Sequence, residues 1–573
     1  MRAFFAACAL TALLARPALP ENAIAPGTPA ADPPTVVCLG VWWPYTGDDN
    51  ANASVAVRYR MKGSGEDAWR EAMPLFRIRT EDLPADEFAP KALPRAFAGS
   101  VFDLKPGTEY EIELSLTDPD GGSVRKMLAS TTMKVPYAPE GLEVVKVAPG
   151  GLEEALRNAK AGQVLLLGKG THTGNFKVSV QATAEKPFVI RGESQEAVLD
   201  GGGGGSILDV SGTAFVYVEG LTFRNGCEAV RAHSADGLVV RRCLIDGLGW
   251  GIRNTVREKP GRDFYIADNV FRGPCAWPAP QGKIEGEEAV EVLGSGHVVC
   301  YNSFKGYGDC ISIYRNPAVS IDFYNNEMDT ATDDGIEMDY SDRNTRCFRN
   351  RVTNARVGYS LQPIYGGPCY VIANEAFNTQ YTIFKLHNQP SGGVLLHNTS
   401  VRQGTPLVVW STIPVVNFIF RNNLFIGTDE RMANWTSKNI GVDLDYDAYG
   451  PGKIKFKVSN EWYESLEDAR KRGGIELHGL NLDPPFFAGE VKIPADPTQH
   501  VEPIDPELAE GSRAVDAGIR IPNINDGFKG KAPDIGSREK GGIPPHFGPR
   551  PEHTDELTDY EKRIAAAGDE EKR

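Results

Sequence analysis

Two acidic side chains that stand two residues apart give the first indication of chemistry in this sequence. Glu337 and Asp339 alternate with the apolar residues Ile336 and Met338. If the segment is a β-strand, the apolar pair faces one side and the two carboxyl groups face the other, with their Cβ atoms ~6.6 Å apart. Two carboxyl groups at about this separation can share the acid and base roles in the hydrolysis of a glycosidic bond.

More polar side chains recur at the matching positions of neighbouring segments. Aligning these segments as stacked strands ~4.8 Å apart predicts columns of side chains on one outer face. The first column is Glu291, Ser312, Glu337, Ser360 and Lys385, and the second is Leu293, Tyr314, Asp339, Gln362 and His387. A third column, in the turn before the strand, is Glu288, Asp309 and Asp334, with Asp333 beside it. An error of one residue in this register would exchange the two faces.

These residue types also fit a second reaction, the β-elimination of a uronic acid polysaccharide. Removal of the proton next to a uronic carboxylate needs a cation on that carboxylate, a base, and a proton donor for the leaving oxygen. We expect Lys385 or His387 to be the base, and Tyr314 or its neighbour Arg315 to assist the leaving group. Ca²⁺ prefers oxygen ligands. The carboxylates that could hold it are Glu291, Asp309, Asp333 and Asp334, together with Glu337.

Aromatic side chains near these columns are candidates for binding sugar rings. They are Trp250, Trp277, Tyr307, Tyr340, Tyr365, Tyr381 and Trp410. Aromatic residues in stacked strands more often pack in the core or between coils, so not all of these will face a ligand. We predict that Tyr340, Tyr365 and Trp410, with the amide of Gln362, contact the substrate.

A sequence repeat predicts the strands that position these residues. Six asparagines lie 24 residues apart: Asn302, Asn326, Asn350, Asn374, Asn398 and Asn422. A fixed period of this size indicates a solenoid, in which each turn packs only against its neighbours. The surrounding phrases, such as 301–304, are β-branched and aromatic, which favours strands. The sequence therefore predicts a β-helix with an asparagine at each bend.

The opening of the solenoid carries a family resemblance. A short amphipathic helix that starts at Gly151 is followed by apolar strands at 164–167, 187–192 and 218–223. This order resembles the pectate-lyase-like superfamily, and within it the opening segment of chondroitinase-B-type and alginate lyases. The resemblance implies an all-β, right-handed parallel β-helix over 145–427, with a helix over its open end. It also implies a site of Lys or Arg with calcium-binding carboxylates.

The resemblance does not specify a reaction, because this fold carries lyases, hydrolases, epimerases and proteins without activity. Residues 308–313 and 333–336 are also similar to the Asp-rich turns of polygalacturonases, although the Arg-Ile-Lys motif of that family is absent. The Asp-Pro-His-Asp motif of C5-epimerases of this fold is absent as well. Lyase and hydrolase therefore both stay open.

Four further regions flank the predicted solenoid. Residues 1–30 resemble a signal peptide with its leader, because an apolar run follows Arg2. Residues 35–137 alternate as strands, and the phrase 104–114 resembles fibronectin type III domains, so we expect a β-sandwich there. Residues 428–547 are predicted to form a C-terminal cap, and 548–573 a charged flexible tail.

Charge and cysteine content narrow the partners and the compartment. The formal net charge of −15 argues against nucleic-acid binding, and an acidic glycan would need a basic patch or a bridging Ca²⁺. No segment after the leader is long and apolar enough for a membrane span, so we expect a secreted or periplasmic monomer. Removal of Cys8 would leave eight cysteines, which allows disulfides, although Cys on solenoid strands is commonly a small buried residue.

The sequence thus predicts an exported protein that cleaves a polysaccharide on the outer face of turns 288–388. Elimination at a uronic acid is narrowly preferred over hydrolysis by Glu337 and Asp339. The alternative from another class is a protein without catalytic activity that binds glycans or attaches to a surface.

Overall fold

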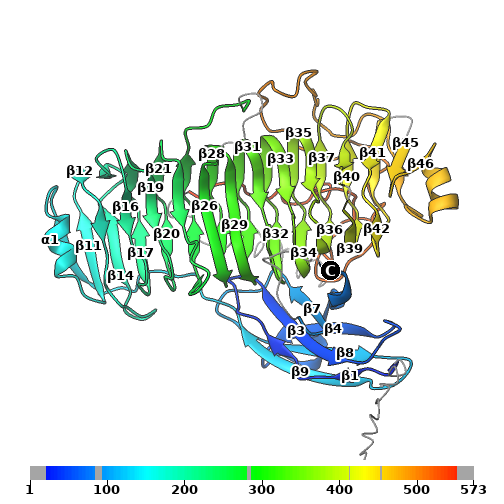
Figure 1. Ribbon diagram of the computed structural model, residues 1–573, viewed down its shortest axis with the longest axis horizontal. Coiled ribbons are helices and arrows are strands. Elements are labelled where there is room, and N and C mark those ends of the chain that lie inside the picture. The colour runs from blue at the N-terminus through cyan, green and yellow to red at the C-terminus, as the bar shows by residue number, and fades with distance from the viewer. Residues whose placement is uncertain (1–20, 84–92, 280–285, 412, 452–454, 552–573) are drawn as a thin grey trace, which may run out of the picture.

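The computed structural model describes residues 21–83, 93–279, 286–411, 413–451 and 455–551. Within these ranges the chain forms an N-terminal antiparallel β-sandwich and a long parallel β-solenoid, with few helices (Figure 1). The all-β parallel β-helix that the repeat predicts is confirmed. Residues 1–20, which make up most of the predicted signal peptide and leader, lie outside the described residues.

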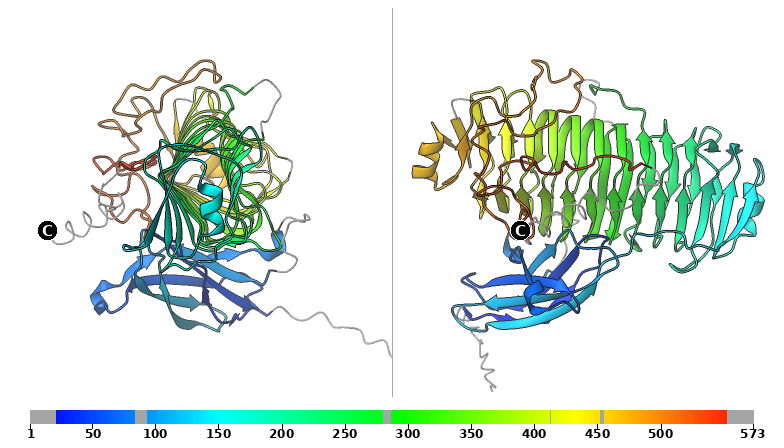
Figure 2. Two further views of the ribbon diagram at one scale, coloured as in Figure 1. Left: turned by 90° about the vertical axis from the view of Figure 1, so that its left-hand side faces the viewer. Right: turned by 180° about the vertical axis from the view of Figure 1, so that it is seen from behind.

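Two long parallel sheets form the walls of the solenoid. One has 14 strands and its path runs from β10 (Glu143–Val147) to β42 (Asn439–Ile440). The other has 20 strands and runs from β12 (Gly170–Thr173) to β47 (Leu480–Asn481). At the N-terminal end the helix α1 (Leu152–Arg157) lies across the opening, and its buried first residue joins the apolar core (Figure 2). The predicted capping helix is therefore present.

The longest strands lie in the middle of the 20-stranded sheet. They are β26 (Glu288–Ser295), β29 (Asp309–Val319), β31 (Glu327–Glu337), β33 (Arg351–Ser360) and β35 (Glu375–Lys385). Beyond β35 the wall continues as a smaller sheet, since Thr382 Oγ1 donates to Val408 O at 2.8 Å. This sheet consists of β38 (Leu407–Val409), β41 (Arg431–Trp435), β45 (Lys455–Val458) and β46 (Glu461–Tyr463).

A column of buried asparagines runs through the inside of the solenoid. The backbone N–H and the side-chain amide of Asn326 both donate to Oδ1 of Asn350, at 3.1 Å and 2.9 Å. The same pattern joins Asn269, Asn302, Asn326, Asn350, Asn374, Asn398, Asn423 and finally Asp447. We call this column the asparagine ladder. It satisfies polar groups that would otherwise be buried without partners.

The last asparagine of the predicted repeat is wrong by one position. Asn423, not Asn422, continues the ladder from Asn398, and the two are 25 residues apart. Asn422 occupies the corner before the ladder position, with a left-handed φ of 59°. The corresponding corners of earlier turns hold Tyr301, Asn325, Arg349, Ala373 and His397, with φ between 52° and 55°. Asparagine suits both positions, which is why the adjacent pair shifted the alignment.

The N-terminal domain is a sandwich of two antiparallel sheets around Trp43, which is fully buried. One sheet contains β1 (Ala25–Pro26), β2 (Ala30–Ala31), β3 (Leu39–Thr46), β6 (Phe76–Ile78) and β7 (Ala96–Val101). The other contains β4 (Ser54–Met61), β5 (Arg70–Ala72), β8 (Glu109–Thr117) and β9 (Val124–Thr131). The architecture is compatible with the predicted domain, whose membership of the fibronectin type III family stays a prediction.

The sandwich is fixed to the outer face of the 14-stranded sheet. Phe102 packs edge-on against Phe348 and Tyr370, with ring centroids 5.9 Å and 5.1 Å apart. An ion pair of 2.7 Å joins Asp32 of the sandwich to Arg343, four residues after Asp339. The sandwich is therefore packed against the solenoid through both apolar and charged contacts.

The C-terminal segment turns back along the solenoid. After the short helices α2 (Leu466–Asp468) and η3 (Ala469–Gly473), the chain crosses earlier turns towards the N-terminal end (Figure 2). Asn325 Nδ2 donates to His546 O at 2.8 Å, and Arg550 pairs with Asp268 at 2.7 Å. Residues 548–551, which the sequence assigns to a flexible tail, are thus bound to the solenoid. The rest of that tail, 552–573, lies outside the described residues.

None of the eight cysteines after Cys8 forms a disulfide within the described residues. Six of them are buried: Cys38, Cys243, Cys300, Cys310, Cys347 and Cys369. This agrees with their expected role as small buried residues of the strands. Among the described residues there is no helix of the length and apolarity that a membrane crossing requires.

Candidate active site

The predicted first column is present on the outer face of the 20-stranded sheet. Strand pairing from β26 to β35 brings its members side by side in the predicted order: Glu291, Ser312, Glu337, Ser360 and Lys385. Ile336 and Met338 are fully buried, whereas Glu337 between them is partly exposed. The register predicted for the first column and the inward direction of Ile336 and Met338 are therefore confirmed, whereas Leu293 of the predicted second column is fully buried.

Glu337 and Asp339 form one hydrogen-bonded pair of acids. Asp339 is only 2% exposed, and its Oδ1 accepts from Ser360 Oγ at 2.8 Å and from the backbone N–H of Gln362 at 2.7 Å. Burial and the neighbouring charge of Asp339 raise the pKa of Glu337 well above its usual value. Burial also raises the pKa of Asp339 to about 6, against the lowering effect of Lys385. Glu337 is therefore the member of the pair that keeps its proton to higher pH, and its carboxyl group donates a hydrogen bond to Asp339.

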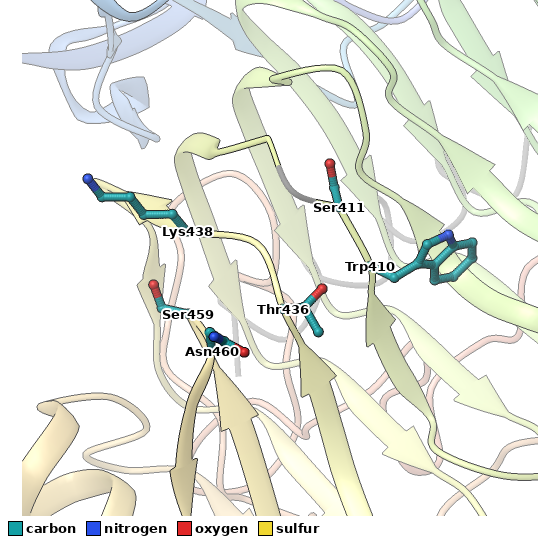
Figure 3. Close-up of a pocket in the computed structure, with 6 residues that line it drawn as sticks. All are labelled: Trp410, Ser411, Thr436, Lys438, Ser459 and Asn460. Carbon is teal, nitrogen blue, oxygen red and sulfur yellow. The ribbon is translucent and has the colours of Figure 1, made fainter.

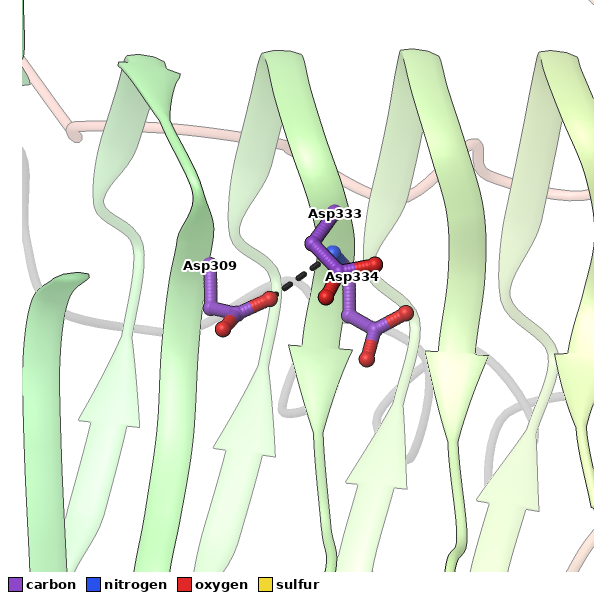
Figure 4. Close-up of side chains that lie close together, drawn as sticks. All are labelled: Asp309, Asp333 and Asp334. Carbon is purple, nitrogen blue, oxygen red and sulfur yellow. Dashed lines mark hydrogen bonds between the residues drawn. The ribbon is translucent and has the colours of Figure 1, made fainter. Parts of the chain in front are cut away.

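The turn column forms a second acidic group, which we call the turn cluster. Carboxylate oxygens of Asp309, Asp333 and Asp334 lie within 4.8 Å of one another (Figure 4). The backbone N–H of Asp334 donates to Asp309 Oδ1 at 2.8 Å. Burial and the charges of the other two acids raise the pKa of Asp309 well above its usual range, and burial raises that of Asp334 to about 7. Asp334 Oδ1 is buried and has no hydrogen-bond partner among the described residues.

Lys385 is an ion-pair partner and does not fit the predicted role of base. Its Nζ lies 2.6 Å from Asp334 Oδ2 and 3.9 Å from Asp333 Oδ1. Burial lowers its pKa, but the surrounding carboxylates, Asp334 first, raise it more, so that the pKa stays above its usual value. A lysine must lose its proton before it can accept one, and this environment opposes that loss.

His387 retains the properties of a base. Burial and the positive charge of Lys385 lower the pKa of His387, so its imidazole is neutral at pH 7. Its Nε2 is buried without a hydrogen-bond partner among the described residues, and its ring meets Trp410 edge-on at 5.0 Å. Tyr314 and Arg315 lie at partly exposed positions, where the Arg315 guanidinium stacks 4.3 Å over Tyr340 and 5.1 Å over Tyr314.

Glu291 does not belong to the turn cluster, contrary to its predicted role as a metal ligand. It is 3% exposed, and its Oε2 pairs with Arg253 Nε at 2.7 Å. Its neighbour Glu288 accepts a hydrogen bond from Ser312 Oγ. Burial and the charge of Glu291 raise the pKa of Glu288 to about 7. Of the five carboxylates that the sequence suggests for a cation, the described site thus groups three, Asp309, Asp333 and Asp334, and it leaves out Glu291 and Glu337.

The predicted substrate contacts divide by exposure. Tyr365 is fully buried, so its predicted contact with a sugar is wrong. Gln362 serves Asp339 through its backbone N–H, and Tyr340 lies under Arg315. Trp410, by contrast, is 37% exposed. Of the other candidates, Tyr381 is 45% exposed and Tyr307 is fully buried in the core.

Two arginines of the site were not predicted. Arg253 pairs with Glu291, and Arg356 lies 3.8 Å from Asp333 and 4.8 Å over the ring of Tyr381. The 23-residue interval between Asp333 and Arg356 is close to the repeat, so extending the turn column by one strand could have found it. Arg253 lies directly opposite Glu291 where β22 (Trp250–Arg253) pairs with β26, but the 38-residue interval between them departs from the 24-residue repeat, so the period alone does not find it.

Comparisons with known proteins give structural neighbours only. No protein-family model matches the chain, and no curated protein matches it. Among solved structures, an alginate lyase from Paenibacillus sp. str. FPU-7 shares 16% identity with a TM-score of 0.33, over 55% of this chain and 97% of that one. The catalytic domain of a GH87 alpha-1,3-glucanase in complex with nigerose shares 13% identity with a TM-score of 0.26, over 75% and 86%. At this similarity neither protein assigns an activity to this chain.

Proposed function

We propose that this protein is an exported enzyme that cleaves a polysaccharide by hydrolysis on the outer face of the 20-stranded sheet. The Glu337–Asp339 pair is the main support for this proposal. It combines a partly exposed carboxyl group, whose pKa is raised well above its usual value, with a buried acid that holds this group in place. A carboxyl group with a raised pKa is what general-acid catalysis of glycoside hydrolysis requires.

In the proposed reaction Glu337 gives its proton to the glycosidic oxygen as the bond from that oxygen to the anomeric carbon breaks. A water molecule supplies the new oxygen on that carbon, and its proton passes to a carboxylate, so one water is consumed for each bond. Asp333 suits this second role, because its side chain is 13% exposed whereas that of Asp334 is fully buried. Asp339 acts as a positioning residue, since its buried carboxyl group is held by Glu337, Ser360 and Gln362.

Elimination at a uronic acid with Ca²⁺ is the second candidate, and the turn cluster favours it. Three carboxylates with oxygens within 4.8 Å and one buried oxygen without a partner fit the oxygen ligands that Ca²⁺ prefers. A bound Ca²⁺ would neutralise the carboxylate of the substrate and so ease removal of the neighbouring proton. His387 would then be the base, because its imidazole is neutral while Lys385 stays charged.

The product separates these reactions. We would incubate the purified protein with a panel of neutral and uronic polysaccharides and measure new reducing ends together with the ultraviolet absorbance of unsaturated uronate. Hydrolysis gives reducing ends without that absorbance, whereas elimination gives both. Hydrolysis also predicts that Glu337→Gln abolishes cleavage while Lys385→Ala mainly weakens binding.

Elimination would be favoured if the wild-type protein forms products with that absorbance and if Glu337→Gln and Lys385→Ala both lose cleavage. Removal of Ca²⁺ with a chelator should then stop the reaction as well. No cleavage of any member of the panel, combined with measurable binding, would overturn the enzymatic proposal in favour of a glycan-binding protein. The melting temperature of each variant serves as the folding control, because Lys385→Ala leaves Asp334 buried without its cation.

A further inference from the structure

We call the first column and the turn cluster together the acidic columns. A pocket lies beyond them, on the turns of the solenoid that follow β35. Its volume is about 690 Å³, within the range of ~300–1,000 Å³ typical of small-molecule sites. Its lining comes from the segments that follow β38, β41 and β45: Trp410, Ser411, Thr436, Lys438, Ser459 and Asn460. Figure 3 shows Trp410 and Lys438 on opposite sides, with Thr436 between them.

Exposed aromatic rings connect this pocket to the acidic site. Arg356, which lies 3.8 Å from Asp333, stacks 4.8 Å over Tyr381. Tyr381 is 5.9 Å from Trp410, and Trp410 also contacts His387 at 5.0 Å. Tyr381 and Trp410 are 45% and 37% exposed, so a large part of each ring faces solvent at some cost in hydrophobic free energy. The faces of such rings suit the apolar faces of sugars.

The polar groups of the lining are suited to a sugar with a negative charge. None of the six side chains is acidic, although the chain as a whole carries a formal net charge of −15. Lys438 is exposed and forms no ion pair with any other described residue. The hydroxyls of Ser411 and Ser459 accept backbone N–H groups from Ile413 and Asn439, and no acceptor for their own protons is found within the described residues.

We propose that this pocket binds an anionic sugar unit of the polysaccharide that is cleaved at the acidic columns. The inference rests on the proposed function, because the pocket would bind the part of the polysaccharide that lies beyond the cleaved bond. Trp410 and Tyr381 support the sugar rings between the two places, and Lys438 pairs with a carboxylate or sulfate. Because neighbouring strands are ~4.8 Å apart, the pocket lies within a few turns of Lys385. One polysaccharide chain can therefore occupy the pocket and the acidic columns together.

The test measures binding in the Glu337→Gln protein, so that its result does not depend on cleavage. Calorimetric titration would use hexamers of three kinds: a uronate oligomer, a sulfated glycosaminoglycan oligomer and a neutral glucan. We expect one of the anionic hexamers to bind and Trp410→Ala to weaken it by roughly tenfold. Lys438→Ala should weaken it by a similar factor and reduce its dependence on salt, and Lys438→Glu should weaken it further.

Trp462→Ala is the matched control, because Trp462 is 44% exposed on β46 and does not line the pocket. It should leave the affinity unchanged, and all variants should keep the parent melting temperature. Binding that ignores both Trp410→Ala and Lys438→Glu would overturn the pocket assignment. Equal binding of the neutral hexamer, or no binding of either anionic hexamer, would overturn the anionic specificity. Failure of Glu337→Gln to reduce cleavage would contradict the proposed function alone.

Discussion

The asparagine ladder and the acidic columns repeat along the same solenoid but treat their polar groups in opposite ways. Inside, each amide donates to the next turn, as between Asn326 and Asn350 at 2.9 Å, and each side-chain oxygen accepts. Outside, the acids are crowded. Glu337 and Asp309 have pKa values well above the usual range, and Asp334 leaves one buried oxygen without a partner among the described residues.

This difference separates a structural column from a chemical one. The ladder shows that stacked turns at this spacing can give every buried polar group a partner. The raised pKa values and the unpartnered oxygen of the outer acids are therefore not a necessary result of the solenoid fold. Groups with strongly shifted pKa values that share one face are characteristic of catalytic and ligand-binding sites. We therefore expect changes in the ladder to alter stability and changes in the acidic columns to alter function.

Breaking the ladder should have the largest effect on stability. Asn350→Leu removes the acceptor of two donors on Asn326 and the side-chain amide that donates to Oδ1 of Asn374, whereas the backbone N–H of residue 350 keeps its own bond to that oxygen. At ~1–3 kcal/mol for each unsatisfied buried group, we expect the free energy of unfolding to fall by roughly 4 kcal/mol. Urea denaturation followed by circular dichroism would measure it.

A corner residue of the preceding turn provides the control. The side chain of Asn325 makes one hydrogen bond, to His546 O at 2.8 Å, and Asn325→Ala should cost about 1–2 kcal/mol, because it loses this bond and places alanine at a left-handed φ of 55°. Equal losses from the two variants would contradict the structural role assigned to the ladder. Activity per folded molecule should stay unchanged in both.

Binding of Ca²⁺ at the turn cluster should stabilise the folded protein, and the size of this effect should depend on pH. The native state keeps protons on Asp309 and Asp334 that the unfolded chain releases above about pH 4, so these acids lower stability as the pH rises through about 7. A cation on the turn cluster relieves this cost. We expect millimolar Ca²⁺ to raise stability by ~1–3 kcal/mol at pH 8 and by less at pH 5. Thermal melts with Ca²⁺ or chelator measure this.

The matched variant is Asp333→Asn, which removes one of the three negative charges of the turn cluster and keeps the shape of the side chain. It should reduce the calcium effect at pH 8. A calcium effect of the same size in wild type and variant would show that the ion binds elsewhere, and no effect in wild type would remove the metal site from the account.

Asp339→Asn should shift the pH dependence of kcat/KM more than it lowers the maximal value of kcat/KM. The charge of Asp339 raises the pKa of Glu337, so its removal lowers that pKa, and Glu337 then loses its proton at lower pH. The alkaline limb of the profile of kcat/KM should therefore move to lower pH. An unchanged limb would mean that Glu337 is not the acid that titrates there.

The smallest effect is expected where the ladder ends in an acid. Asp447 accepts from the backbone and side chain of Asn423, and burial raises its pKa to about 7. Because its native pKa lies above the unfolded value, stability falls as the pH rises towards 8. Asp447→Asn removes this titration and should therefore raise stability at pH 8 more than at pH 5. A gain of the same size at pH 5 would contradict this explanation.

The periodic features of the molecule could be predicted from the sequence, and the electrostatic ones could not. Alternation of Ile336 and Met338 with Glu337 and Asp339 was sufficient for the register, because only one face of each strand can enter the core. The protonation state of Lys385 could not be predicted, because its pKa depends on burial and on three carboxylates that the fold brings together. The burial of Tyr365 likewise follows from packing that no local pattern encodes.

The most direct test of the account is the kcat/KM of Glu337→Gln, compared with wild type on whichever polysaccharide of the panel is cleaved. Glutamine keeps the shape of the side chain but cannot give a proton to the leaving oxygen. We predict a loss of roughly 10²–10⁴-fold with no decrease in melting temperature. Activity within a few-fold of wild type, in a variant that is fully folded, would contradict the assignment of the acidic columns as the active site.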